Sequence, residues 1–216
     1  MKTILWALSS IALLAACAGN PPPPAWQTSA HDALAAGTAA YLEGNSRVAD
    51  LEFGIARREI SATGRPDLLA RAELTRCATR VASLEIDQCA GYQPYAADAG
   101  AELQAYAAYL NGRWQSLDAA LLPPQHRAVA ANAGGALGDI KDPLARLVAA
   151  GAMLQAGRIT PPAIEAAIDT ASAQGWRRPL LAWLGVQLQR TREAGAVDAA
   201  ARIQRRIDLI ANNPAR

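Results

Sequence analysis

The chain has 216 residues and a mass of 22.6 kDa, with 51% hydrophobic and 19% charged residues, enough for one ordinary globular domain or two small ones. A net charge of +2 is too small for nucleic acid to be the main partner. With only 16 glycines and 13 prolines, the composition also excludes a collagen-like chain.

The N-terminal segment has the pattern of an export signal. Lys2 supplies one positive charge, and residues 4–16 are apolar or small apart from two serines. A helix of this length spans roughly 20 Å, which is short of the ~30 Å hydrocarbon core of a bilayer. The pattern therefore predicts a signal peptide over residues 1–16 rather than a retained transmembrane helix.

The end of this segment, Leu14-Ala15-Ala16-Cys17, resembles the lipobox of bacterial lipoproteins. The resemblance implies that the signal is cut before Cys17, that its sulfur carries a diacylglyceryl thioether, and that the new amine is acylated. Each buried methylene contributes about 0.8 kcal/mol, so two or three acyl chains give a nearly permanent anchor. The alternative is an ordinary cleaved signal followed by an incidental cysteine.

The residues after Cys17 indicate which membrane holds the protein and how the domain is attached to it. In lipoproteins of this type an Asp directly after the cysteine favours the inner membrane, whereas here that residue is Ala18. The resemblance thus implies the outer membrane of a Gram-negative cell, with the domain facing the periplasm. Residues 17–26 form the expected tether, in which four prolines at 21–24 favour an extended polyproline helix of about 3.1 Å per residue.

Residues 27–216 are predicted to form one all-α domain, because helix-forming residues dominate and no segment alternates like a strand. A turn is expected at Gly91–Pro94 and a loop at Ala133–Asp139. The expected helices are Thr28 or Ser29 to Gly44, 46–63, one opened by Pro66, 94–110, 114–121, one opened by Pro123-Pro124, 143–155, 161–175, 179–193 and 196–211.

The first helix pair resembles a tetratricopeptide repeat. Gly37, Gly44, Ala49, Phe53 and Ala56 stand at spacings of 7, 5, 4 and 3, as in that motif. The chain departs from the motif where the usual large aromatic residues and the closing proline would stand. Their positions hold Ala33, Ala40 and Ser61.

The last helix pair also resembles this repeat, through Leu184-Gly185, Gly195, Ala200 and Ile207, with three extra residues in its first helix. Residues 66–155 show no such match. Two arrangements therefore stay open: antiparallel helical hairpins stacked like a solenoid, or an irregular helical bundle.

Cys77 and Cys89 are the other two cysteines, and in an exported protein an even pair is most simply a disulfide. Unbroken helix would hold their α-carbons about 18 Å apart, whereas a disulfide needs about 5.5 Å. The chain must therefore reverse between them, near residues 85–87. A redox pair is the weaker alternative, and so is a metal site, because the only histidines are His31 and His126.

No motif for catalysis or for a cofactor is recognisable. The chain has no nucleophile elbow, zinc-binding helix, phosphate loop or dinucleotide fingerprint. A glycan-cleaving enzyme would need a buried glutamate or a carboxylate pair. We therefore expect no catalytic residues, no cofactor and no metal.

The C-terminal end is the candidate binding surface. From Arg177 onward there are eight arginines against three acidic residues, and Trp176, Arg177 and Arg178 stand together at a helix junction. Tryptophan and arginine are enriched at binding hot spots, and an anionic partner would suit this end. The alternative is structural, with Trp183 in the core and the arginines on a solvated face.

These observations lead to one functional expectation. The chain resembles a lipid-anchored envelope protein whose helical domain acts as a non-enzymatic adaptor or assembly factor for other envelope proteins. A peptidoglycan-acting enzyme or glycan-binding module of the envelope is the alternative.

Overall fold

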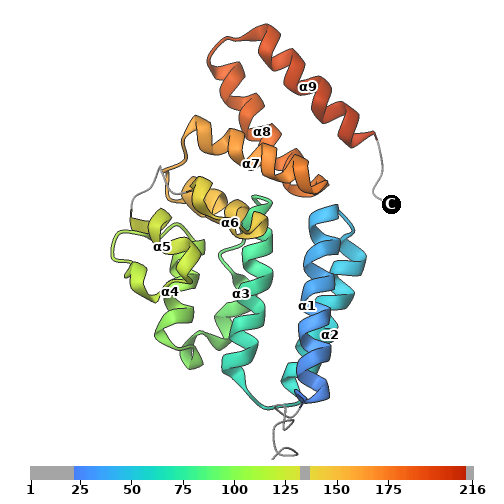
Figure 1. Ribbon diagram of the computed structural model, residues 1–216, viewed down its shortest axis with the longest axis vertical. Helices are drawn as coiled ribbons and strands as arrows, with labels where there is room; N and C mark the ends of the chain where they lie inside the picture. The colour runs from blue at the N-terminus through green and yellow to red at the C-terminus, as the bar shows by residue number, and fades with distance from the viewer. Residues whose placement is uncertain (1–21, 132–136, 213–216) are drawn as a thin grey trace, which may run out of the picture.

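A computed structural model describes residues 22–131 and 137–212 (Figure 1). Over these residues the chain is helical and contains no strand, which confirms the all-α prediction. The expected signal peptide, the lipobox and the first half of the expected tether (residues 17–21) lie outside the described residues, as does the first part of the expected loop at 133–139. The last two residues of the expected tether, Ala25 and Trp26, instead form the start of the first helix. No helix in the described ranges is both long enough and apolar enough to cross a membrane.

The α-helices lie close to their expected bounds. Three short 3-10 helices separate some of them: η2 (Ala90–Asp98), η3 (Ala119–Leu121) and η4 (Leu137–Asp139). The α-helices are α1 (Ala25–Glu43), α2 (Ser46–Ser61), α3 (Pro66–Ala82), α4 (Ala101–Leu110), α5 (Pro124–Ala131), α6 (Pro143–Gln155), α7 (Pro161–Gln174), α8 (Arg177–Glu193) and α9 (Val197–Ala211).

The helix ends follow local sequence signals. The Asp142 side chain accepts a hydrogen bond from the Ala145 amide at 2.6 Å, which satisfies one free donor in the first turn of α6. Thr160 has the same role at α7. Gly44 and Gly175 end α1 and α7 with φ of 100° and 68°, a left-handed conformation that glycine adopts without strain.

Helices α1 and α2 form an antiparallel N-terminal hairpin beside α3, while α6 and α7 cross the upper end of α3 and lead into the α8–α9 hairpin (Figure 1). A methyl group on Gly37 would lie only 3.2 Å from the Phe53 ring, so the glycine lets α1 and α2 approach closely. The largest core cluster runs from α3 to α9. Trp183 is fully buried in it, as expected, and its indole nitrogen donates to the Ala82 carbonyl at 3.1 Å.

The Cys77–Cys89 disulfide is confirmed, with the two α-carbons 5.2 Å apart. The chain reverses as the spacing required, because α3 stops at Ala82 and a turn follows. Within this loop Leu84, Gln88 and Cys89 have positive φ, a conformation that costs non-glycine residues about 1 kcal/mol or more each. The disulfide therefore closes a loop whose backbone is locally strained.

Two predicted helices differ from the structure. The helix expected over 94–110 is divided, because η2 holds Pro94, which lacks a backbone donor, and α4 begins only at Ala101. The helix expected over 114–121 is reduced to the three residues of η3. Its first residue, Trp114, folds back instead and donates its indole N–H to the Tyr109 carbonyl at 2.9 Å.

Candidate functional site

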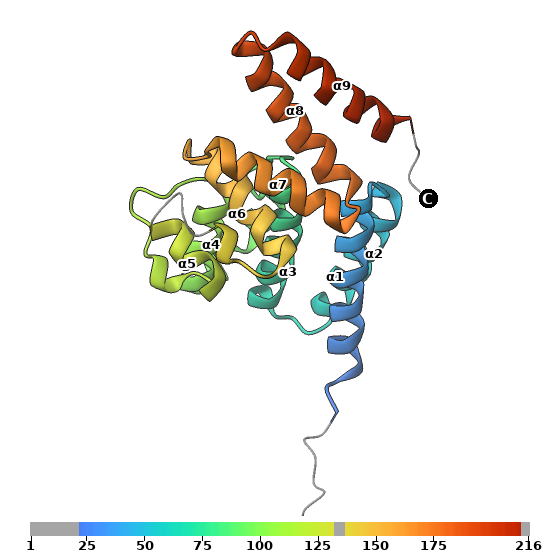
Figure 2. The ribbon, with the colours of Figure 1, turned by 45° about the horizontal axis from the view of Figure 1, so that its top comes forward.

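The C-terminal hairpin α8–α9 lies at one end of the long axis of the molecule. The first turn of α1, where the described chain begins, lies at the opposite end in both ribbon views (Figures 1 and 2). Helix α9 packs against α8 through the buried Ala200 and Ile203, with Ile207 and Ile210 half-buried beside them. The rest of α9 faces outward.

Arg178, one of the expected binding residues, is engaged within the chain. Its guanidinium donates to the Tyr41 carbonyl at 2.7 Å, to Glu85 at 2.8 Å and to the Ser46 hydroxyl at 2.6 Å. It also lies 4.2 Å from the centroid of the Tyr41 ring. These contacts join the start of α8 to the α1–α2 turn and to the end of α3.

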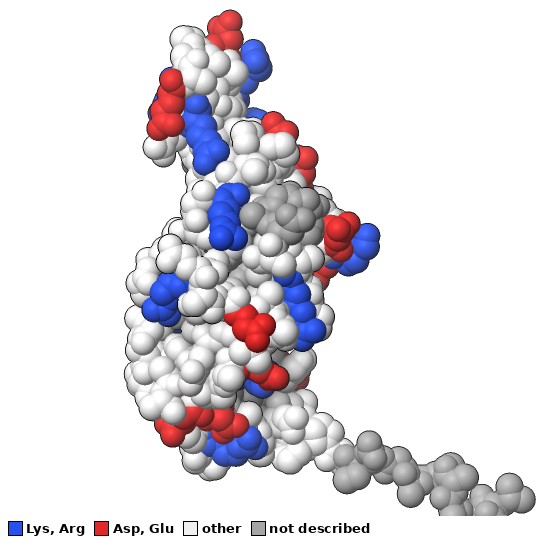
Figure 3. All heavy atoms as spheres, turned by 90° about the vertical axis from the view of Figure 1, so that its left-hand side faces the viewer, with Lys and Arg blue, Asp and Glu red and all other residues white. Residues whose placement is uncertain are grey.

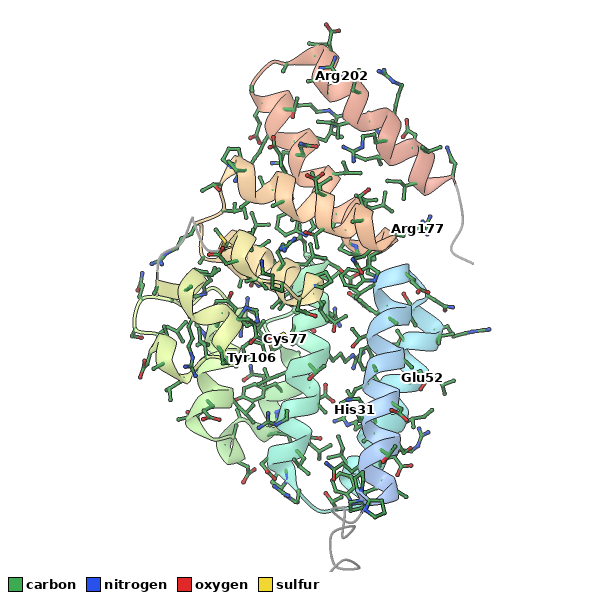
Figure 4. The ribbon with its side chains drawn as sticks, in the orientation of Figure 1. His31, Glu52, Cys77, Tyr106, Arg177 and Arg202 are labelled. Carbon is green, nitrogen blue, oxygen red and sulfur yellow. A yellow bond between two sulfur atoms is a disulfide. The ribbon has the colours of Figure 1, made fainter. Side chains whose placement is uncertain are left out.

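Arg177 and Trp176 are also turned toward the protein. Arg177 donates to the carbonyls of Ile210 and Ala211 at 3.2 and 3.1 Å, where it satisfies free acceptors at the C-terminus of α9 (Figure 4). Trp176 is half-buried against the main core. The structure thus places all three expected residues at the base of the hairpin, where they fix its position.

The exposed side of α9 carries a compact basic surface. Arg202, Arg205, Arg206 and Leu209 follow helical spacings of 3, 4 and 7 residues, which brings them onto one side; we call this set the α9 outer face. The three arginines are exposed, and Leu209 is 75% exposed. Two exposed acidic residues of α9 flank this face: Asp198, one turn before Arg202, and Asp208, three residues after Arg205.

Sequence reasoning missed this face because it treated the terminal arginines as one group. Helical spacing in the sequence predicts an apolar stripe of Val197, Ala200, Ile203, Ile207 and Ile210, whereas in the structure Val197 is 77% exposed at the first turn of α9. The helical spacing could have revealed this face, because it places Leu209 on a different side of the helix from the stripe of Ile203, Ile207 and Ile210.

A cleft between the N-terminal hairpin and α3 is the second candidate. It has a volume of about 290 Å³, and we call it the hairpin cleft. Glu73, only 7% exposed, faces Arg57 at 3.5 Å, and Asp50 faces Arg76 at 3.2 Å. The lining residues are Leu34, Asp50, Phe53, Gly54, Arg57, Leu69, Ala72, Glu73 and Arg76.

Four tyrosines cluster between residues 92 and 109, and the sequence predicts core and rim positions for them rather than a ligand site. Tyr109 is fully buried and Tyr92 nearly so, while Tyr95 and Tyr106 are half-buried. The Tyr109 hydroxyl lies 3.3 Å from Nδ1 of His126, which is also buried. Burial lowers the pKa of His126 to about 4, against a weaker opposing effect from Asp142, so the imidazole is neutral at physiological pH.

The described residues include no group of three His, Cys, Asp or Glu side chains placed to hold a metal ion. Comparisons with protein-family models, with curated proteins and with solved structures found no match to this chain.

Proposed function

We propose that this protein is a lipid-anchored periplasmic adaptor that binds other envelope proteins through the α9 outer face. The observation that carries the proposal is the placement of this face. It lies on the hairpin farthest from the first turn of α1, which is the end of the helical domain nearest to Cys17 along the chain (Figures 1 and 2). An anchor at Cys17 leaves the hairpin pointing away from the membrane.

The contacts at the base of the hairpin support this proposal, because a binding surface is positioned more precisely when it lies on a rigid support. Arg178 ties α8 to the α1–α2 turn, and Arg177 holds the end of α9. Trp183 adds a buried hydrogen bond from α8 to the end of α3. The α9 outer face is therefore held in a fixed relation to the rest of the domain.

The chemistry of the face suggests the kind of partner. It presents three guanidinium groups beside one large exposed leucine, and arginines next to an apolar anchor are typical of binding hot spots. Their charge favours a partner with carboxylates around an apolar pocket that accepts Leu209. Two copies of the face would repel each other, which argues against self-association there.

The hairpin architecture also fits an adaptor. We infer that the α1–α2 and α8–α9 hairpins are tetratricopeptide-like units at the two ends of a less regular helical middle. Gly37 against Phe53 in the first hairpin, and Leu184 with Ala200 buried in the second, support this interpretation. Helical hairpins of this kind present extended surfaces to partner proteins.

Site-specific photo-crosslinking in intact cells tests the proposal. A photoreactive residue at Leu209 is expected to give a discrete adduct with another envelope protein. The matched control is Gln125, an exposed residue on α5 far from the hairpin. Adducts of equal yield from both positions, or none from Leu209, would contradict the proposal.

One observation favours the second candidate, an enzyme acting on peptidoglycan: Glu73 is a buried carboxylate at a cleft. Its ion pair with Arg57, and that of Asp50 with Arg76, favour a structural role instead, because each carboxylate already faces an arginine on the neighbouring helix. Incubation with purified peptidoglycan decides between the two. Soluble fragments that appear with the native protein and disappear with Glu73→Gln would favour the enzyme.

A further inference from the structure

A third depression lies between α3, α4 and α5 and has a volume of about 380 Å³; we call it the α3–α5 groove. Figure 4 shows Tyr106 in the space between α4 and α3. The side of the molecule that carries α4 and α5 is covered mostly by uncharged residues (Figure 3). The lining residues are Arg71, Leu74, Thr75, Glu102, Leu103, Tyr106, Leu121, Leu122, Pro123, Pro124 and Arg127.

The charged residues of this groove differ from those of the hairpin cleft. Arg71 on α3 and Arg127 on α5 contribute two guanidinium groups, against one carboxylate from Glu102. Within the described part of the chain, neither arginine forms an ion pair, although Arg127 donates its Nε–H to the Leu122 carbonyl at 2.8 Å. In the hairpin cleft, by contrast, Arg57 and Arg76 each face a carboxylate. The α3–α5 groove therefore keeps positive charge available beside an apolar lining.

The size and the construction of the groove indicate what it can hold. An extended peptide usually binds by adding main-chain hydrogen bonds to a sheet edge, and the groove is built by helices whose main-chain groups are paired internally. The volume falls within the usual range for small-molecule sites, and a lining of leucines beside two guanidinium groups suits a small ligand that is apolar along its chain and anionic at its head.

We propose that the α3–α5 groove binds a single-chain anionic amphiphile, with its acyl chain along the apolar lining and its carboxylate between Arg71 and Arg127. Leu103 and Leu121, which are half-buried, supply apolar surface for the chain from two different segments. The excess of guanidinium groups over carboxylates selects an anionic head over a cationic one. This site is separate from the α9 outer face, and its occupancy does not depend on the adaptor role.

Competition against a fluorescent probe tests the site. Anilinonaphthalene sulfonate, which is itself apolar and anionic, is expected to bind the purified domain and to be displaced by dodecanoate below its micelle concentration. The double variant Arg71→Gln/Arg127→Gln is expected to bind dodecanoate at least tenfold more weakly. The matched control is Arg113→Gln/Arg158→Gln, whose arginines line a different surface depression, and it is expected to bind dodecanoate like the native protein.

Three results would overturn the proposal: no saturable binding of dodecanoate, equal weakening in both double variants, or displacement by dodecylamine as effective as by dodecanoate. A second readout covers the case in which a variant folds poorly. In the native protein, dodecanoate is expected to shift the methyl NMR signals of Leu103 and Leu121 and to leave that of Leu209 unchanged. Shifts spread evenly over the leucines would contradict the site.

Discussion

The guanidinium of Arg178 lies 4.2 Å from the centroid of the Tyr41 ring and donates a 2.7 Å hydrogen bond to the carbonyl of the same residue. Tyr41 lies in the last turn of α1 and Arg178 in the first turn of α8, so this pair joins the N-terminal hairpin to the C-terminal hairpin. Burial raises the pKa of the Tyr41 hydroxyl well above its usual range, helped by the neighbouring Glu85. The N-terminal hairpin is therefore fixed to the base of the C-terminal one.

Loss of the Arg178 side chain is expected to destabilise the fold. Arg178→Ala removes hydrogen bonds to Tyr41 and Ser46 and the contact with the ring, a loss of about 3 kcal/mol in the free energy of unfolding. Glu85 is 41% exposed, so its ion pair adds little. Arg178→Lys should recover less than half of the loss, because an ammonium cannot reproduce the planar fork. Urea unfolding measures both values.

Arg177→Ala is the matched control for this prediction. It removes two hydrogen bonds at the end of α9 and is expected to cost only about 1 kcal/mol. Equal losses for the two variants would show that Arg178 has no special role in joining the hairpins.

Two helical glycines are expected to respond in opposite directions to alanine. A methyl group on Gly151 in α6 would collide with the backbone of Val81 in α3, so Gly151→Ala should lower the free energy of unfolding by about 1–3 kcal/mol. Gly185 in α8 has open space around it, and Gly185→Ala should raise stability by roughly 0.5–1 kcal/mol. Thermal unfolding of the two variants gives the sign of each change.

The disulfide is expected to contribute to stability by closing a short loop. Replacing Cys77 and Cys89 together with alanine should lower the free energy of unfolding by about 3 kcal/mol on the chain-entropy model. Denaturant unfolding of the native protein, with and without this double change, measures the difference. A loss below about 0.5 kcal/mol would mean that the strained turn at residues 84–89 keeps its structure without the disulfide.

Stability is expected to fall as the solution becomes acidic. The folded-state pKa of His126 is about 4, below the ~6.5 of an unfolded chain, so the unfolded state takes up the proton first. His126 therefore disfavours the folded state increasingly as the pH drops from 6.5 to 4, by at most about 3 kcal/mol. Unfolding midpoints measured over this range should decline with pH.

Substitution of each histidine separates this effect from general acid destabilisation. His126→Phe should flatten the decline between pH 6.5 and 4. His31→Gln is the matched control, because it removes an exposed histidine rather than a buried one. An identical pH profile in the native protein and in His126→Phe would contradict the assignment.

The sequence predicted the parts of the fold that depend on local signals. Helix periodicity, the capping glycines and the Pro66 and Pro161 starts gave most helix bounds, and the twelve-residue spacing of Cys77 and Cys89 gave the chain reversal. The sequence did not predict that the helix expected over 94–110 is divided before α4, at Gly100. It also did not predict that Trp114 folds back onto Tyr109 instead of starting a helix. These depend on contacts of η2 with α3 and of Trp114 with Tyr109 that form only in the packed domain.

The candidate surface, too, could be predicted only in part from the sequence. Composition located the basic C-terminal region, but it did not separate arginines that hold the hairpin from arginines that face outward. Arg178 donates to the carbonyl of Tyr41, which is far away in the sequence. Arg177 donates to the carbonyl of Ile210, at the far end of the hairpin. Only Arg202, Arg205 and Arg206 remain exposed on one side of α9.

The anchor remains the central expectation for the protein in the cell. The sequence contains three cysteines, and the disulfide uses two of them, which leaves Cys17 as the single thiol for acylation. The most direct measurement compares membrane fractionation and intact mass of the native protein and Cys17→Ser. We expect the native product to fractionate with membranes and carry acyl mass, and Cys17→Ser to lose both. The same fractionation and the same processed mass in the two proteins would contradict the lipid anchor.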